Sequence, residues 1–224
     1  MSDDFSQSWQ KLNQIRSLPS PPESAAISFL IFILSSPDEN ELVQTAAVHA
    51  LIRFEDSSSS PLLSLFDETS DTAIQSRISF VLSRFKSVPS SFIEKNICHP
   101  NSFVRKNCVY GAGQIQNQIQ NPTQILVSSL IQKLTVILYE DPDPTISFEA
   151  AETLFRLNPD PSFFNRILQK RVPDIHVLNK IIEISGEIGD LSTAEVLKSY
   201  LSDPDDRIVG TTCLSIQKIQ MKKK

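Results

Sequence analysis

The sequence has little glycine and no long apolar run. It contains 5 glycines against 14 prolines, and because sandwich and βαβ proteins need glycine in tight turns, short helices separated by proline are favoured. The longest apolar run, 25–34, is about half of the roughly 20 residues that a membrane-spanning helix needs. We therefore expect an all-α protein without a membrane span.

Paired cysteines and clustered histidines are also missing. The 3 cysteines are odd in number and form no CxxC pair, so neither a disulfide framework nor a zinc site is predicted. The histidines lack the i, i+4 spacing of a helical metal site. Acidic residues stand at the N-terminus where a secretory signal has basic ones, and a cytoplasmic location is the prediction.

Basic clusters are scarce. The formal net charge is −5 and the pI is about 5.3, whereas nucleic-acid surfaces are built from clustered lysine and arginine. The one dense basic run lies in the tail 220–224, for which a solvated end is favoured over a binding site. No nucleic-acid partner is predicted.

Self-contained catalytic motifs are absent as well. The sequence has no GxSxG, no P-loop and no HExxH, and the GAGQI segment at 111–115 lacks the strand that a dinucleotide fingerprint requires. We predict no catalytic, cofactor-binding or metal-binding residue.

A repeated turn is present instead. Pro-Asp or Pro-Asn pairs recur between helical segments, and the last three stand 31 residues apart. The first two are separated by 63 residues, close to twice that period, and Ser70-Asp71 lies midway. A period of this length is typical of stacked helical hairpins. The turns are Pro37-Asp38, Pro100-Asn101, Pro142-Asp143, Pro173-Asp174 and Pro204-Asp205.

Equivalent positions after these turns carry equivalent side chains. Three residues after the turn aspartate or asparagine, five units have a β-branched apolar residue, namely Ile74, Val104, Ile146, Val177 and Ile208. The first unit is displaced by one and offers Leu42. Small or apolar residues return four to five positions later, on the same helical face, and among them are Cys108 and Cys213, which we expect to be buried.

These patterns predict an α-solenoid of about six helical hairpins with an N-terminal capping helix. The expected parts are a capping helix and Pro-rich loop at 1–22, the repeats at 23–219 with an insertion at 114–124, and a basic tail at 220–224. The serine run at 57–60 is expected to be a loop. The predicted pairs are 23–34 with 40–54, 61–67 with 72–85, 90–98 with 102–115, 122–139 with 145–157, 161–172 with 175–188, and 192–201 with a helix ending at 219.

The Gln/Asn-rich insertion at 114–124 has two interpretations. Its uncharged amides either extend the preceding helix or form a long loop. A tolerated surface extension is favoured over a functional site.

Three segments resemble the HEAT-like repeats of the phycobilisome-lyase family. They are DPDPTISFEAAETLFRL at 141–157, HPNSFVRKNCVYGAGQI at 99–115, and SGEIGD at 185–190 followed by DPDDRIV at 203–209. The resemblance covers about 23–219. In that family an arginine after the β-branched residue pairs with the turn aspartate of a neighbouring unit, and Arg105 alone stands at that place here.

The resemblance implies a role near phycobiliproteins. Proteins with these repeats include subunits of heterodimeric bilin lyases, which attach or detach phycobilins at phycobiliprotein cysteines, and factors of antenna assembly or breakdown. Under the lyase hypothesis, a cysteine thiol could bind the bilin transiently. Cys98, beside His99, is the candidate, because we expect it to be exposed at a hairpin turn. The acidic turns resemble calcium ligands in number, but helix capping is favoured for them.

The outward side chains of the second helix of each hairpin are the predicted interaction surface. Mixed charge with interspersed aromatic residues suits a protein partner. The predicted partner-binding residues are Arg84, Arg105, Lys106, Tyr110, Glu149, Arg156, Asn179 and Glu183.

The leading hypothesis is a protein-binding scaffold, either non-enzymatic or co-catalytic, whose partner is a second HEAT-like subunit or a phycobiliprotein. The alternative is one subunit of a heterodimeric bilin lyase, with phycobilin as the group transferred. Nucleic-acid binding, as in solenoid DNA-repair enzymes, is disfavoured by the negative charge.

Overall fold

The computed structural model of the chain describes residues 2–118 and 124–222. Within them it contains thirteen α-helices, one 3₁₀-helix and no strand, so the predicted all-α solenoid fold is confirmed. None of the helices in these two ranges is long and apolar enough to cross a membrane. The chain divides into two compact units, Met1–Ile119 and Gln120–Lys224, which are described separately as unit 1 and unit 2.

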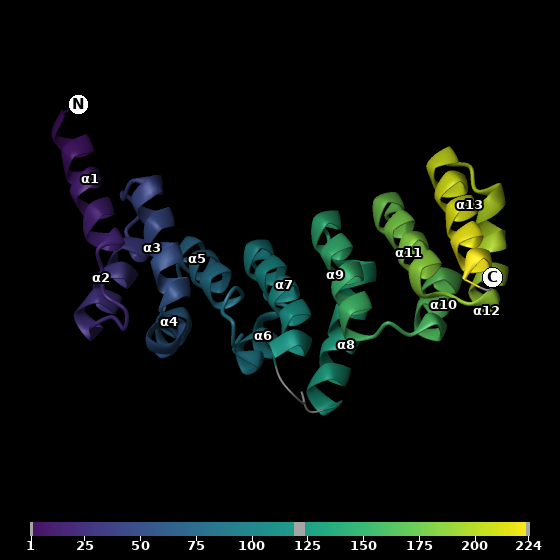
Figure 1. The fold of residues 1–224 in the computed structure, drawn as a ribbon, viewed down its shortest axis with the longest axis horizontal. Helices are drawn as coiled ribbons and strands as arrows, with labels where there is room; N and C mark the ends of the chain where they lie inside the picture. The colour runs from purple at the N-terminus through teal and green to yellow at the C-terminus, as the bar shows by residue number, and fades with distance from the viewer. Residues whose placement is uncertain (1, 119–123, 223–224) are drawn as a thin grey trace. The chain divides into compact units, whose positions relative to one another are not determined.

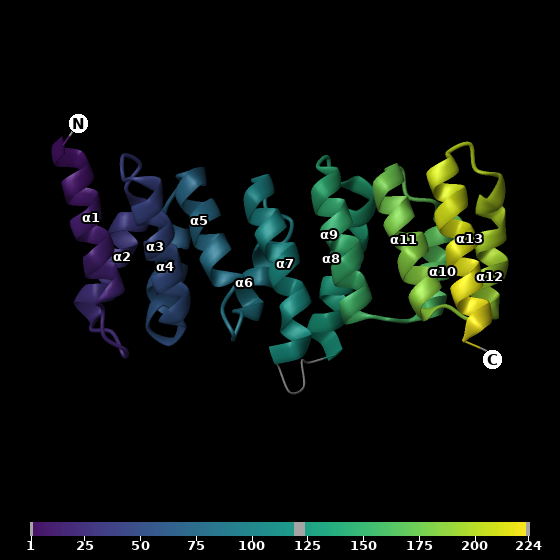
Figure 2. The same ribbon diagram turned by 45° about the horizontal axis from the view of Figure 1, so that its top comes forward.

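Unit 1 is built from three hairpins and an additional helix. Contacts pair α2 with α3, α4 with α5 and α6 with α7, and α1 packs on α3 as the predicted capping helix. Further contacts join α3 to α5 and α5 to α7, so these second helices lie side by side (Figures 1 and 2). The helices are α1 (Ser2–Arg16), α2 (Ser24–Ser35), α3 (Glu41–Arg53), α4 (Glu55–Glu68), α5 (Thr72–Leu82), α6 (Ser90–Asn96) and α7 (Ser102–Gln118).

Unit 2 repeats this arrangement. Contacts pair α8 with α9 and α10 with α11, and α13 packs on both α12 and η1. In addition, α11 packs against both α9 and α13. The second helices α9, α11 and α13 therefore form a row (Figure 1). The elements are α8 (Gln124–Glu140), α9 (Pro144–Leu157), α10 (Pro161–Lys170), α11 (Ile175–Ile188), α12 (Leu191–Lys198), η1 (Ser199–Ser202) and α13 (Asp206–Met221).

The side chain of an aspartate or asparagine caps the N-terminus of each second helix. Each of these side chains accepts a hydrogen bond from the backbone N–H two residues later, which satisfies one of the free donors of the first helical turn. The predicted capping role of the turn residues is confirmed for Asp205, which accepts from the Arg207 N–H at 2.9 Å. The caps are Asn40, Asp71, Asn101, Asp143, Asp174 and Asp205.

Four residues after the cap, unit 1 uses a long polar side chain to close the turn. The Gln44 Nε2 donates to the Ser36 carbonyl at 2.6 Å, and the Gln75 Nε2 donates to the Thr69 carbonyl at 3.0 Å. At the same position, the Arg105 Nη1 donates to the carbonyls of the α6–α7 turn. These bonds hold the loop between the two helices of each hairpin.

The first repeat corrects the expected register. Leu42 was expected at the buried position, but it is 69% exposed, whereas Val43 is fully buried. The cap of α3 is Asn40, so the turn lies two residues beyond Asp38 and Val43 is the third residue after the cap, as in the other repeats. Ile74 is only half-buried, while Val104, like Val43, is fully covered.

The serine run at 57–60 is not a loop as expected. It belongs to α4, which begins at Glu55. The buried Ser58 hydroxyl donates to the Leu51 carbonyl at 2.9 Å, and the Glu55 carboxylate accepts from the backbone N–H groups of Lys86 and Ser87 at 2.5 and 2.8 Å. These contacts compensate for the weak helix propensity of serine.

Cys213 was expected in the core, and this expectation is wrong because its side chain is exposed. Ser215 determines the register of α13, since its hydroxyl donates to the Ile182 carbonyl at 3.0 Å and it lies beside Gly186 of α11. Cys213 therefore faces away from α11. The residues that α13 buries are Ile208, Thr212, Ser215 and Ile219.

The expected insertion at 114–124 lies partly outside the described residues. Its first part, 114–118, belongs to α7, and α8 begins at Gln124. Residues 119–123 lie outside the described part, and so does the end of the tail, 223–224. The boundary between the two units follows Ile119, within the expected insertion.

The close approach of α11 and α13 at Gly186 leads to a stability prediction. A Cβ atom at position 186 would lie 2.8 Å from the Ser215 Cα, so Gly186→Ala should lower the free energy of unfolding by about 1–3 kcal/mol. Gly210 has nothing within 4 Å of the equivalent atom, so Gly210→Ala is the control and should raise it by about 0.4–1 kcal/mol. Urea unfolding followed by circular dichroism measures both, and equal effects would contradict the proposed contact.

The cap of α13 predicts a dependence of stability on acid. Hydrogen bonds from the Arg207 side chain and backbone N–H lower the pKa of Asp205 from 3.8 to about 2. Because the folded pKa is depressed, this stabilisation is present above pH 3.8 and is lost as the pH falls toward about 2. In Asp205→Asn, the urea midpoint should therefore fall less steeply over this range than in the parent chain. If the urea midpoints of the two proteins fall equally steeply with pH, the Asp205 carboxylate does not cause this dependence.

Candidate functional site

The eight predicted partner-binding residues fall into two groups. Seven of them lie on second helices, and Arg84 lies two residues after α5 ends. Arg84, Arg105, Lys106 and Tyr110 belong to unit 1, whereas the other four belong to α9 and α11 of unit 2. Each group is described within its own unit. The structure leaves the proposed role of these residues as a prediction, but it shows what each of them contacts.

A network of ion pairs connects α9 and α11 in unit 2. Arg156 lies 3.8 Å from Glu149 and 3.7 Å from Glu152. Lys180 of α11 lies 2.9 Å from Glu152 and 3.9 Å from Glu183. Glu152 thus bridges the two helices. Because the side chains are partly exposed, the network contributes little to stability, but it fixes alternating charges on the surface.

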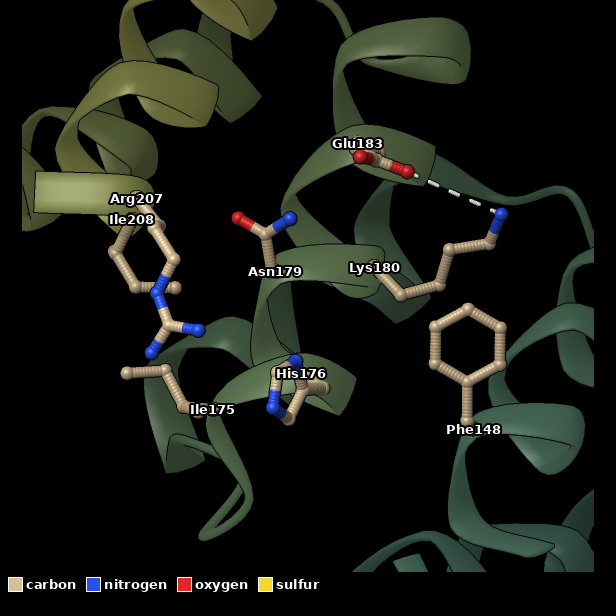
Figure 3. Close-up of a pocket in the computed structure, with 8 residues that line it drawn as sticks. All are labelled: Phe148, Ile175, His176, Asn179, Lys180, Glu183, Arg207 and Ile208. Atoms are coloured by element: carbon tan, nitrogen blue, oxygen red, sulfur yellow. Dashed lines mark ion pairs between the residues drawn. The ribbon is translucent and has the colours of Figure 1, made fainter. Parts of the chain in front are cut away.

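Next to this network lies a cavity of about 170 Å³ between α9, α11 and α13 (Figure 3). Its lining combines two cationic side chains, a carboxylate, a carboxamide, a histidine and apolar groups. The lining residues are Phe148, Ile175, His176, Asn179, Lys180, Glu183, Arg207 and Ile208. We call these residues, together with Glu149, Glu152 and Arg156, the unit 2 face.

Asn179 is the most unusual group of the cavity. Its Oδ1 atom is buried and has no hydrogen-bond partner within the described part of the chain. Figure 3 shows its carboxamide between the side chains of Arg207 and Lys180. Leaving such an acceptor unsatisfied costs about 1–3 kcal/mol, so a ligand with an N–H donor would recover this loss. A carboxamide also matches the donor and acceptor pair of a peptide bond.

The helical register explains how the cavity is assembled. His176, Asn179, Lys180 and Glu183 occupy positions i, i+3, i+4 and i+7 of α11, so they share one side of the helix. The cap by Asp174, which accepts from the His176 and Val177 N–H groups, fixes where that side begins.

Arg84 is the centre of the unit 1 group. Its guanidinium carbon lies 3.4 Å from the Phe80 ring centroid and 4.8 Å from that of Tyr110. The Nη1 atom donates to the Phe80 carbonyl and the Ser83 hydroxyl. Stacking on aromatic rings is a favoured environment for arginine, and here it connects α7 to the end of α5.

The remaining two predicted residues of unit 1 differ in their surroundings. Lys106 is exposed on α7, one turn before Tyr110. The guanidinium of Arg105 lies 3.0 Å from the His99 carbonyl and 2.9 Å from the Pro100 carbonyl, so this side chain also has a structural role in the turn.

Sequence reasoning missed several members of the unit 2 face. Phe148, Glu152, His176 and Arg207 were not predicted to bind a partner. The signal for Glu152 was its spacing of three residues from Glu149, which places both on one side of α9. Arg207 lies in the first turn of α13, two residues after the cap Asp205. Whether its side chain reaches the cavity depends on how α13 is oriented against α11, which the sequence does not give.

The cysteines differ in exposure. Cys98 is exposed, as expected, and Cys108 is buried, where desolvation raises the pKa of its thiol. The pKa of His99 is lowered by burial and by the charge of Arg105. In the ranges that the structure describes, no group of three or more histidine, cysteine, aspartate or glutamate side chains is placed to hold a metal ion.

Comparisons with known proteins concern the fold alone. No protein-family model matches the sequence, and no curated protein does. An engineered protein of known crystal structure has a TM-score of 0.50 at 16% identity, over 88% of this chain and 58% of that one. A second engineered protein has a TM-score of 0.49 at 14% identity, over 96% and 97% of the two chains.

A third solved structure is a designed armadillo repeat protein in complex with the peptide (KR)4. Its TM-score is 0.48 at 13% identity, over 94% of this chain and 98% of that one. This chain spans 58% of the length of the first engineered protein.

Proposed function

We propose that the chain is a protein-binding scaffold that holds an extended segment of a partner protein against the unit 2 face. The observation that supports this proposal best is the buried Asn179 Oδ1 atom, which has no partner among the described residues and lines a cavity beside a row of charged side chains. A peptide N–H is a donor that this carboxamide oxygen can accept.

The charges of the unit 2 face favour a protein partner over a nucleic acid. Glu149, Glu152 and Glu183 lie among the cations Arg156 and Lys180 and pair with them. A polyphosphate chain would be repelled by such carboxylates, whereas a peptide with side chains of both signs can exchange pairs with the network. Phe148, with Lys180 above its ring at 5.5 Å, adds an apolar contact.

For the identity of the partner, we propose a phycobiliprotein subunit or a second HEAT-like chain, in phycobiliprotein or phycobilisome maturation or turnover. This part of the proposal is supported by the resemblance of the segments 99–115, 141–157, and 185–190 with 203–209 to phycobilisome-lyase repeats. Such work would take place in the cytoplasm.

The second candidate function is one subunit of a heterodimeric bilin lyase. The same resemblance supports it, because the family includes such subunits. In that case phycobilin would bind at the subunit interface, and the chain alone would hold it weakly.

The scaffold proposal predicts that a variant of the unit 2 face loses its partner without losing its fold. Asn179→Leu removes the desolvated oxygen, so we expect stability to be unchanged or slightly raised, while the retained partner decreases about tenfold or more. The measurement is affinity purification of the tagged full chain from its own soluble lysate, with quantitative mass spectrometry and a separate unfolding curve.

Lys198→Glu is the matched control for this purification. Lys198 lies on α12 and pairs with Glu195 at 2.7 Å, so this substitution changes charge away from the unit 2 face. Equal retention of every protein by the parent chain and Asn179→Leu would contradict the proposal.

The lyase alternative predicts a visible absorption band. The chain mixed with a HEAT-like partner from the purification and free phycobilin should acquire the band, and transfer of the bilin to a phycobiliprotein should follow. If a partner is retained but no absorption band appears with phycobilin, the lyase proposal is contradicted and the scaffold proposal still holds.

A further inference from the structure

In unit 1 the charges of the first helix α4 differ in sign from those of the second helices α3, α5 and α7. The second helices α5 and α7 contain no acidic residue, and α3 has only Glu41, in its first turn. By contrast, the charged residues of α4 are all acidic, namely Glu55, Asp56, Asp67 and Glu68. The net charge of −5 therefore does not describe the surface of α3, α5 and α7.

Two basic side chains on these helices have internal roles. The Arg77 Nη1 donates to the Leu34 carbonyl at 2.9 Å, and Arg105 holds the α6–α7 turn. The other basic side chains of these helices, Arg53 and Lys106, are exposed. Arg84, two residues after α5 ends, adds a third outward cation.

The same surface carries aromatic rings. Phe103 is 67% exposed and Phe80 is 37% exposed, and Tyr110 lies beside Arg84. We call Arg53, Phe80, Arg84, Phe103, Lys106 and Tyr110 the unit 1 face. Exposed rings of this size next to cations are typical of protein interaction sites.

A cavity of about 680 Å³ borders this face where α3 and α5 end, and Arg53, Arg84 and Lys86 contribute to its lining. Glu55 also lines it, but the carboxylate of Glu55 accepts two backbone N–H bonds from Lys86 and Ser87. Asp56 lines the cavity as well, so three cations outnumber two carboxylates and the net charge of the lining is positive.

From this charge distribution we infer that the unit 1 face binds an extended acidic segment of a partner protein. Carboxylates of the segment would pair with Arg53, Arg84 and Lys106, and apolar side chains between them would contact Phe80 and Phe103. The stacked guanidinium of Arg84 is already oriented, so less conformational entropy is lost when a carboxylate binds. The inference rests on the proposed function only in taking a protein as the occupant.

A single-stranded nucleic acid fits the unit 1 face less well. Bases bind such proteins by stacking on the faces of aromatic rings, but Arg84 already covers a face of Phe80 and lies close to Tyr110.

The test uses the full chain and three fluorescent probes of equal length. They are a twelve-residue peptide of Glu-Glu-Val repeats, its Lys-Lys-Val counterpart and a twelve-nucleotide oligothymidylate. We expect the acidic peptide to bind despite the net negative charge of the chain. The double variant Arg53→Glu with Lys106→Glu should weaken this binding at least tenfold, because attraction becomes repulsion at two positions.

A matched double variant, Lys95→Glu with Lys198→Glu, makes the same change in net charge on the first helices α6 and α12. It should retain the parent affinity. Phe103→Ser should weaken the acidic peptide severalfold without lowering the unfolding midpoint, because the ring is largely exposed.

Three results would overturn the inference. They are no binding of the acidic peptide, equal weakening in both double variants, and tighter binding of oligothymidylate that is lost in Arg53→Glu with Lys106→Glu. None of these results bears on partner retention through Asn179, so a failure here is distinguishable from a failure of the proposed function.

Discussion

Packing of one hairpin against the next is the contact on which the other features depend. Each helix pair has apolar side chains on a limited stripe, so a single pair cannot bury its own surface. In unit 2, Ile181 and Ile208 are fully buried between neighbouring second helices, and Gly186 allows α13 to approach α11 closely. This packing also decides which side of each second helix is left exposed, and so it determines the outward faces.

The two outward faces differ although their repeats are built alike. On the unit 2 face, cations and carboxylates pair across α9 and α11, so the net field is small, and the buried Asn179 oxygen finds no hydrogen-bond partner within 2–118 and 124–222. On the unit 1 face, Arg84 stacks between aromatic rings and nearby acidic residues lie on α4. The same scaffold therefore offers two chemically distinct surfaces.

Most of the fold could be predicted from sequence because period, turn and cap are local features. The errors were of two kinds, one local and one that depends on a tertiary contact. Leu42 was chosen over Val43 because Asn40 was not recognised as the cap, and Cys213 was expected inside because the register of Ser215 against Gly186 depends on another hairpin. For the candidate site, Asn179 and Glu183 were found from helical register. Glu152 was missed although its spacing from Glu149 is a local signal, whereas Arg207 became apparent only from the packing of α13 against α11.

The segregated charges of unit 1 also make it an electric dipole. Basic side chains on α3, α5 and α7 are set against the acidic side chains of α4, so an approaching charged protein experiences a torque before any atoms touch. At physiological ionic strength this field extends about 8 Å from the surface. Orientation during the last steps of diffusion raises the association rate, so salt should act on how often partners meet more than on how long they stay together.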